Sequence, residues 1–423
     1  MKTLFSLSAF KKPLMHPADA PAASCGGQKG PVHEPDTEEL ISILEHDSKL
    51  KALVIKSIAK AKECNPDPVT NPVQSLEDFY KFMDWATKCM PWKMIYEGEK
   101  VFSLPFDQVA QGLIYFYFLL DQPLEELEGN GNFYNSLQYV EPLRTWIIHY
   151  CQSWAKFLDT PASWSDKYYQ AVLPDPNFGL DPKLGWYEDP KNWHNFNDFF
   201  ARRLKDEHSR PIASPDDDSV VAAPADACPQ GAWAIDDNSY ICGENEGVII
   251  KASVFTSIPD LLGGKSKYCH AFAGGTMTHT YLNEADYHHF HFPMSGTVKE
   301  ACIIMQDADV GGTVVWSKKA NRYVLLDQKP GWQTIESRGL IVIDTEKFGT
   351  VALLPIGMGQ VSSVVFKPEI KPGAKVKKGD EIGNFYFGGS DFVIVFQKGV
   401  KFELTAEVLK HQLMGEQYGI VSR

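Results

Sequence analysis

The chain has 423 residues, 44% of them hydrophobic and 22% charged, which is the balance of an ordinary soluble globular protein. This length is sufficient for two or three domains with at least one large core. Asp and Glu (54) outnumber Lys and Arg (41), and the formal net charge of −13 argues against nucleic acid or an anionic membrane surface as the main partner.

Other features of the composition concern the compartment. The longest strongly apolar run, residues 113–120, is far shorter than the roughly 20 residues of a membrane-spanning helix, so we expect no integral membrane association. The eight cysteines are scattered without a Cys-x-x-Cys pair, and the N-terminal residues are unlike a clear secretory signal. We therefore predict a cytoplasmic protein with reduced thiols. No feature of the sequence indicates an oligomeric state.

The first half of the chain is predicted to be helical. Residues 1–36 are rich in small residues, Gly and Pro, and we expect a flexible leader there. Helical periodicity then runs from Thr37, taken as the helix cap, to Ile58. The same 3.6-residue pattern recurs in residues 76–85, 109–120 and 140–158. The sequence thus predicts an α-helical domain over residues 37–172, followed by a Pro- and Gly-rich junction.

The second half changes to short β-type runs separated by Gly, Pro and Asp. The main runs are residues 248–250, 296–298, 314–316, 323–326, 340–343, 351–354, 361–366 and 392–396. Many short strands with this punctuation favour an antiparallel sandwich or barrel. Residues 371–383 also resemble the hairpin of lipoyl- and biotinyl-type sandwich domains. We therefore predict an α+β protein whose C-terminal domain, residues 173–423, is an antiparallel β-sandwich or barrel-like domain.

A serine follows two glycines at Gly388-Gly389-Ser390, directly before the last of these strands. On a strand-to-strand turn such a serine can be exposed and its backbone strained, which suits attack of its hydroxyl on the preceding carbonyl. The resulting ester would eliminate, and the dehydroalanine left behind would hydrolyse to an N-terminal pyruvoyl group. By itself, however, Gly-Gly-Ser is above all a turn sequence.

Three upstream segments accompany this serine. They are Phe196-Asn197-Asp198-Phe199-Phe200 with Arg202, Arg203, Arg210 and Pro211; Ala223-Pro224-Ala225-Asp226; and Asp286-Tyr287-His288-His289-Phe290-His291. Together with Gly389-Ser390, these segments resemble the phosphatidylserine decarboxylase family, whose signatures are Phe-Phe-x-Arg, Ser-Pro-Ala-Asp-Gly, Asp-Tyr-His-Arg-x-His and a late Gly-Ser site. The sequence departs from the family pattern at Ala227, His289, residues 336–338 and Asp391.

The resemblance implies self-cleavage between Gly389 and Ser390, after which the two chains remain associated. Ser390 would become a covalent pyruvoyl group, so that pyruvate is the cofactor and neither a metal nor an added organic cofactor is needed. His291 is implied as the base that activates Ser390, and Asp226 as the carboxylate that orients this base. His288 is implied to assist decarboxylation by managing the proton at the substrate Cα.

The resemblance also bears on the substrate. An acidic chain without an anchoring helix or a basic surface resembles the branch of the family that decarboxylates free amino acids, such as the fungal soluble L-tryptophan decarboxylases. We predict a free L-amino acid, with an aromatic one favoured, that forms a Schiff base and releases the amine and carbon dioxide. The alternative substrate is phosphatidylserine, which would give phosphatidylethanolamine.

Two other classes of function use the same residues. His288, His289 and His291, with His270 and His279 nearby, offer zinc ligands on a sandwich fold, as in lysostaphin-type metallopeptidases. This alternative leaves the Gly-Gly-Ser and Phe-Phe-x-Arg segments unexplained. The third alternative is a non-enzymatic scaffold whose aromatic helical domain binds a partner.

Overall fold

The computed structural model describes residues 33–86, 88, 115–128, 136–242, 248–250, 253–255, 257–283, 285–305, 313–326, 336–358, 363–387 and 389–423. Most of the predicted leader and the first half of the predicted helix 109–120 lie outside these residues. The helices are α1 (Pro35–His46), α2 (Ser48–Cys64), α3 (Leu76–Ala86), α6 (Leu143–Leu158), α7 (Asp166–Val172), α8 (Phe196–Phe200) and α9 (Ile258–Leu261). Of the described helices, none is long and apolar enough to cross a membrane.

The predicted helix 37–58 is in fact two helices. α1 begins at Pro35, whose fixed φ suits the first helical turn, so the cap predicted at Thr37 is wrong; Thr37 is a buried residue of that turn. The helix is interrupted at Asp47. The Asp47 carboxylate accepts hydrogen bonds from the backbone N–H groups of Lys49 and Leu50 and so caps α2. The hydrophobic periodicity of the sequence continues across Asp47. The periodicity therefore predicted one helix and did not reveal the interruption.

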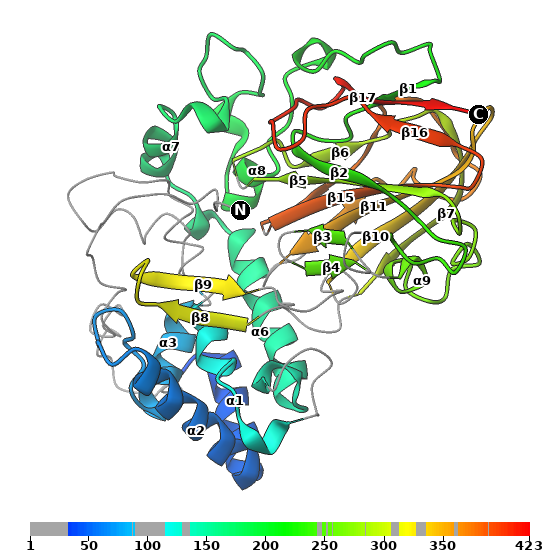
Figure 1. The fold of residues 1–423 in the computed structure, drawn as a ribbon. Coiled ribbons are helices and arrows are strands. Elements are labelled where there is room, and N and C mark those ends of the chain that lie inside the picture. Colours follow the sequence, from blue (N-terminus) through cyan, green and yellow to red (C-terminus); the bar gives the residue numbers. More distant parts are fainter. Residues whose placement is uncertain are drawn as a thin grey trace.

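The strands follow the helices, as predicted. They are β1 (Val220–Ala222), β2 (Cys228–Ala234), β3 (Val248–Ile250), β4 (Ser253–Phe255), β5 (Thr276–Leu282), β6 (His289–His291), β7 (Gly296–Ile304), β8 (Thr313–Ser317), β9 (Arg322–Leu326), β10 (Arg338–Thr345), β11 (Gly349–Met358), β12 (Val364–Phe366), β13 (Lys375–Val376), β14 (Glu381–Phe385), β15 (Gly389–Phe396), β16 (Lys401–Leu404) and β17 (Gln417–Ser422). The mixed α+β class, with helices N-terminal and strands C-terminal, is confirmed (Figure 1).

The central sheet has seven strands in the order β13-β7-β10-β11-β15-β5-β2, and each pairing is antiparallel. Residues along its strands alternate between two cores, as the two-residue period of a strand requires. One core contains Ile341 and Phe392 and is covered by the sheets β1-β17-β16 and β12-β14-β6. The other contains Leu340 and Val393 and is covered by α9 and the loop after it. The result is a layered β structure with β15 inside it.

The hairpin β8–β9 comes from the β-rich half of the sequence but packs on the N-terminal helices (Figure 1). Val314 and Tyr323 are buried in the same core as α1, α2 and α3. The Tyr323 hydroxyl donates to the carbonyl of Thr70 at 2.6 Å, and the backbone N–H of Val314 donates to the buried Asp121 carboxylate at 3.1 Å. The hairpin thus connects the C-terminal half of the chain with the helical core, whereas the predicted boundary near residue 172 assigns the two to different domains.

Helix α6 connects the helical core to the region that carries the family motifs. Its first three turns, with Trp146 and Tyr150, belong to the helical core. Its last turns, with Trp154 and Leu158, belong to a second aromatic core that also includes Phe196 and Phe387. The indole of Trp154 meets the Phe387 ring edge-on, with centroids 5.4 Å apart. The helical domain therefore reaches the residues directly before the predicted cleavage site.

Candidate active site

The predicted cleavage site lies at the start of an interior strand. Gly389 and Ser390 are the first two residues of β15, and Ser390 pairs with Gly357 of β11 on one side and Leu282 of β5 on the other. The prediction that Gly389 and Ser390 form a strand-to-strand turn is therefore wrong, because both are already in the ladder. Gly388 and the side chain of Ser390 lie outside the described part of the chain.

The segment before the cleavage site runs beside His288. The backbone N–H of Phe385 donates to the carbonyl of His288 at 2.9 Å. The Phe200 ring stacks on the His288 imidazole with centroids 3.8 Å apart and also meets Phe387 at 5.5 Å. Two motifs far apart in sequence, Phe-Phe-x-Arg and the histidine segment, are thus brought to the residues that precede Ser390.

His288 is fully buried, and neither of its ring nitrogens has a hydrogen-bond partner among the described residues. Burial, together with the positive charge of Arg202, holds the pKa of His288 well below its usual value, although the backbone at Asp286 and Phe200 acts in the opposite direction. The imidazole is therefore neutral near pH 7, so that one nitrogen carries a proton and the other can accept one.

The hydrogen bonds of His291 determine which of its ring nitrogens carries the proton. Its Nδ1 lies 2.8 Å from the carbonyl oxygen of Gly379, which can only accept a hydrogen bond, so Nδ1 carries the proton. Nε2 is then an acceptor, and the hydroxyl of Tyr287 donates to it at 3.1 Å. Burial lowers the pKa of His291 to about 4, so the ring is a neutral base at physiological pH.

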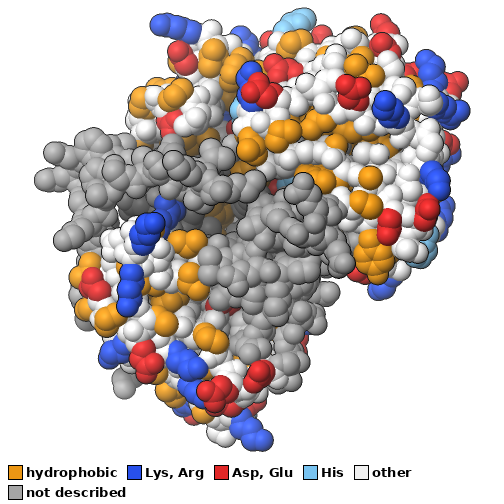
Figure 2. Space-filling model, in the orientation of Figure 1, with side chains coloured by type: hydrophobic (Ala, Val, Ile, Leu, Met, Phe, Trp, Pro, Cys, Tyr) orange, Lys and Arg blue, Asp and Glu red, His pale blue; other side chains and the backbone are white. Residues whose placement is uncertain are grey.

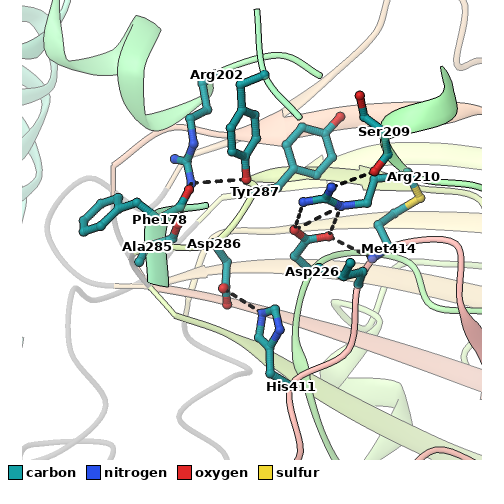
Figure 3. A network of polar contacts seen from close by, with 12 residues as sticks. Phe178, Arg202, Ser209, Arg210, Asp226, Ala285, Asp286, Tyr287, His411 and Met414 are labelled. Atoms are coloured by element: carbon teal, nitrogen blue, oxygen red, sulfur yellow. Dashed lines mark hydrogen bonds and ion pairs between the residues drawn. The ribbon is translucent and has the colours of Figure 1, made fainter. Parts of the chain in front are cut away.

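Asp226 is bound to Arg210 rather than to His291. The guanidinium reaches the carboxylate through Nη2–Oδ2 at 2.6 Å and Nε–Oδ1 at 2.9 Å, and the backbone N–H of Met414 donates to Oδ1 at 2.8 Å (Figure 3). The Asp226 segment nevertheless lies beside His291, because the backbone N–H of His291 donates to the carbonyl of Pro224 at 2.8 Å. The carboxylate charge raises the pKa of His291 slightly, against the larger opposite effect of burial.

The structure thus brings the segments of Asp226, His288 and His291 together, and among the described side chains the Asp226 carboxylate bonds to Arg210 and not to His291. The motif segments are held together by a second set of polar contacts, in which Asp286 accepts from His411 Nε2 at 2.8 Å and Arg202 Nη2 donates to the carbonyl of Ala285 (Figure 3). Arg202 is fully buried and its Cζ lies 4.5 Å from the centroid of the Tyr187 ring. Sequence reasoning gave the two arginines no role, although both stand in the family motifs.

Two other polar residues that the sequence marked as departures are also buried. His289 lies between the Glu381 carboxylate, 2.6 Å from Nδ1, and the carbonyl of Ala201, 2.8 Å from Nε2. Asp391, directly after Ser390, lies 3.3 Å from Nε2 of the buried His279. His289 and His279 are therefore both held in the interior by contacts with other residues of the protein.

The zinc alternative finds no arrangement of ligands in the part of the chain that the structure describes. There, no group of three His, Cys, Asp or Glu side chains could hold a metal ion. Both nitrogens of His289 and of His291 are taken up by protein partners, and His288 is stacked on Phe200.

Comparison with known proteins agrees with the site motifs. Residues 196–420, more than half of the chain, match the family model named phosphatidylserine decarboxylase. The chain belongs to the phosphatidylserine decarboxylase family. The match begins at α8 and extends into β17, so it contains all of the predicted site residues and does not contain α1, α2, α3, α6 and α7.

Several curated relatives share the same region. The chain is 33% identical over 228 residues to phosphatidylserine decarboxylase proenzyme 2 of Oryza sativa subsp. japonica, a match that covers 52% of this chain and 32% of the relative. It is 29% identical over 251 residues to the phosphatidylserine decarboxylase proenzyme of Vibrio campbellii, covering 55% and 80%. It is 27% identical over 226 residues to decarboxylase iboD of Amanita muscaria, covering 49% and 59%.

The match therefore spans about a third of the rice relative and four fifths of the Vibrio relative. The names in the family indicate a decarboxylase, that is, a carboxy-lyase, and several name a proenzyme.

Proposed function

We propose that this protein is a self-processing decarboxylase that cleaves itself between Gly389 and Ser390 and acts on a free L-amino acid with an aromatic side chain. The observation that carries the proposal is the state of His291: a buried, neutral imidazole whose Nδ1–H is fixed by Gly379, so that Nε2 is left as a base. This base lies within residues 196–420, which match the family model, and relatives in this family are named proenzymes.

In the proposed cleavage the Ser390 hydroxyl oxygen attacks the carbonyl carbon of Gly389, and its proton passes to Nε2 of His291. The Gly389–Ser390 amide bond breaks as His291 returns this proton to the nitrogen of Ser390, and an ester takes its place. Removal of the Cα proton of residue 390 then expels the Gly389 carboxylate and leaves dehydroalanine. Addition of water and loss of ammonia give the pyruvoyl end. Residues 1–389 and 390–423 would stay together, because β15 is an interior strand.

A pyruvoyl carbonyl, once formed, supplies an electrophile that withdraws electrons from the substrate as carbon dioxide leaves. We assign His288 to hold the proton that returns to the substrate Cα, because it is neutral, buried and without a protein partner among the described residues. Asp226 would act on His291 through its charge, since no hydrogen bond joins the two.

Several observations support an aromatic amino acid. His288 is stacked on Phe200, and Phe387, Phe196 and Trp154 extend this buried aromatic cluster beside the residues that precede Ser390. Basic and acidic side chains are interspersed on the face of the molecule that Figure 2 shows. The net charge of −13 disfavours an anionic lipid surface. The proposal includes a cytoplasmic location, which the scattered spacing of the eight cysteines along the sequence supports. Phosphatidylserine is the second candidate, and the names of the rice and Vibrio relatives favour it.

Two measurements test the proposal. Mass spectrometry and a denaturing gel should show wild-type protein as two fragments, with residues 390–423 beginning in a pyruvoyl group that reacts with phenylhydrazine, and Ser390→Ala as one inactive chain. Cleavage of Ser390→Ala, or activity of the intact chain, would contradict self-processing. Carbon dioxide release should then be followed with a panel of free amino acids and with phosphatidylserine vesicles. Release from the vesicles alone would leave the self-processing part in place and replace the substrate.

A further inference from the structure

The base nitrogen of His291 is already occupied in the uncleaved chain. A neutral imidazole has one acceptor nitrogen, and here it is Nε2, because Nδ1 donates to Gly379. The Tyr287 hydroxyl donates to that same nitrogen at 3.1 Å. The proposed attack by Ser390 needs the lone pair that Tyr287 holds.

Tyr287 is well placed to hold this hydrogen bond. Its side chain is buried, and its ring lies parallel to the ring of His289 with centroids 5.0 Å apart. Burial and the negative charges of Glu381 and Asp226 raise the pKa of Tyr287 well above its usual value, so the hydroxyl keeps its proton and remains a donor. Packing and protonation therefore both favour the bond to His291.

We propose that Tyr287 is a positioning residue that restrains self-cleavage: its hydroxyl occupies Nε2 of His291, and the cleavage step begins when this hydrogen bond opens. The inference rests on the proposed role of His291 as the base for Ser390. Its chemistry is only the exchange of one hydrogen bond, in which the Tyr287 O–H leaves Nε2 and the Ser390 O–H takes its place. Gly379 keeps the His291 ring oriented during the exchange.

The groups that act on the charge of His291 come from three directions. They are Glu381 of β14, Asp226 after β1 and His289 of the same strand, β6. None of them changes when the Tyr287 hydroxyl is removed. A hydrogen bond donated to the neutral ring disfavours protonation, so loss of the hydroxyl should raise the pKa of His291.

The test is the rate of cleavage of newly made Tyr287→Phe. Labelled chain is produced by cell-free synthesis, transferred to buffers of pH 4 to 8, and followed on denaturing gels. We expect cleavage to be about two- to tenfold faster than in the wild type, the effect of one ordinary hydrogen bond. We also expect the acidic limb of the rate profile to move upward by up to about one pH unit.

Tyr168→Phe is the matched control. Tyr168 is a buried tyrosine whose hydroxyl has no hydrogen-bond partner among the described residues, so its removal should change neither the rate nor the profile. Folded Tyr287→Phe that is cleaved more slowly than the wild type overturns the inference. If folding of newly made Tyr287→Phe limits the observed rate, the pKa of His291 is determined by NMR in Ser390→Ala with and without Tyr287→Phe. A rise of the pKa supports the inference, and an unchanged pKa overturns it.

The failures of the two proposals can be told apart with His291→Ala. If His291→Ala is not cleaved and Tyr287→Phe is cleaved no faster than the wild type, the restraint by Tyr287 is overturned and the role of His291 stands. If His291→Ala is cleaved like the wild type, His291 is not the base, and the inference about Tyr287 falls with it.

Discussion

Arg210 and Asp226 form a buried ion pair with two contacts, Nη2–Oδ2 at 2.6 Å and Nε–Oδ1 at 2.9 Å (Figure 3). Their side chains are 1% and 3% exposed. The same carboxylate accepts a hydrogen bond from Met414, which lies beyond the predicted cleavage site. Asp226 thus connects Arg210 to the C-terminal segment, and its removal should affect the fold as well as the proposed chemistry.

Asp226→Asn should destabilise the protein because it leaves the buried charge of Arg210 without its counterion. The expected loss is about 3–5 kcal/mol in the free energy of unfolding, measured by urea unfolding in the Ser390→Ala background. Asp237→Asn is the matched control, since Asp237 pairs with Lys398 on the surface and should leave the urea midpoint unchanged. Equal effects of the two variants would show that the buried pair has no special weight.

The double variant Arg210→Met with Asp226→Leu separates charge from packing. Replacing both members of a buried ion pair by apolar side chains of similar size is often neutral, whereas removing one partner is not. We therefore expect the double variant to regain stability relative to Asp226→Asn. It should still cleave more slowly than the wild type, because the carboxylate charge near His291 is gone.

His288→Phe should separate the chemistry of His288 from its packing. Phenylalanine keeps a ring against Phe200 but has no nitrogen, so the variant should fold and be cleaved into two fragments. Decarboxylation should fall by about 10²- to 10⁴-fold, the usual contribution of a positioned acid or base. Activity near the wild-type level would mean that His288 is only a packing residue. Phe200→Leu, which keeps the imidazole and loses the stack, is the complementary control.

The depressed pKa of His291 predicts a loss of stability in acid. Its pKa is about 4 in the folded chain against a usual value of 6.5, so its contribution is present above pH 6.5 and is lost as the pH falls through 4. The loss from this one group is roughly 3 kcal/mol. Urea midpoints of Ser390→Ala between pH 7.5 and 4.5 should fall less steeply when His291→Gln is added. The same replacement at the exposed His46 is the control.

Asp121 works in the opposite direction, which is why slopes of matched variants must be compared. Burial raises its pKa to about 7, so its contribution to stability is present at low pH and is lost as the pH rises toward 7. The carboxylate accepts from Ser136 and Gln138 through Oδ1 and from the backbone N–H of Val314 through Oδ2.

Asp121→Asn should loosen the β8–β9 hairpin specifically. The amide oxygen can still accept from Ser136 and Gln138, but its NH₂ group would face the N–H of Val314, two donors without an acceptor. We expect the free energy of unfolding to fall by about 1–3 kcal/mol. We also expect faster tryptic cleavage at Lys318 and Lys319 on the exposed hairpin turn. Fragment masses identify the cut. Glu126→Gln, an exposed surface change, should leave the tryptic pattern as in the wild type; an equal acceleration would argue against the Asp121 contact.

The sequence predicted the parts of the structure that depend on local periodicity and on motifs. Helix 140–158 and the strand 392–396 correspond to α6 and β15, because one apolar face or a continuous apolar run marks each. The segments around Asp226, His288 and His291 were also recognised, and they do come together. The order of the motifs along the sequence was sufficient to recognise these segments, because that order is typical of the family. It contains no information about the contacts between the segments.

Contacts between distant segments could not be predicted in the same way. Nothing in the sequence near Asp226 shows that Arg210 takes up its carboxylate, or that Tyr287 takes the base nitrogen of His291. The packing of Tyr323 with α2 joins residues more than two hundred positions apart. These contacts depend on the three-dimensional course of the chain, and a local pattern contains no information about it.

Strand β15 is the place where folding and the proposed self-cleavage would be coupled. While the chain is one polypeptide, the short connection from β14 keeps β15 close to its place between β11 and β5. The conformational entropy that is lost when β15 takes this place is therefore small. After the proposed cut before Ser390, unfolding would release residues 390–423 as a separate molecule, and refolding would require two molecules to meet. We therefore expect the precursor to unfold reversibly and the mature protein to unfold irreversibly, so that its working lifetime is set by the rate of unfolding.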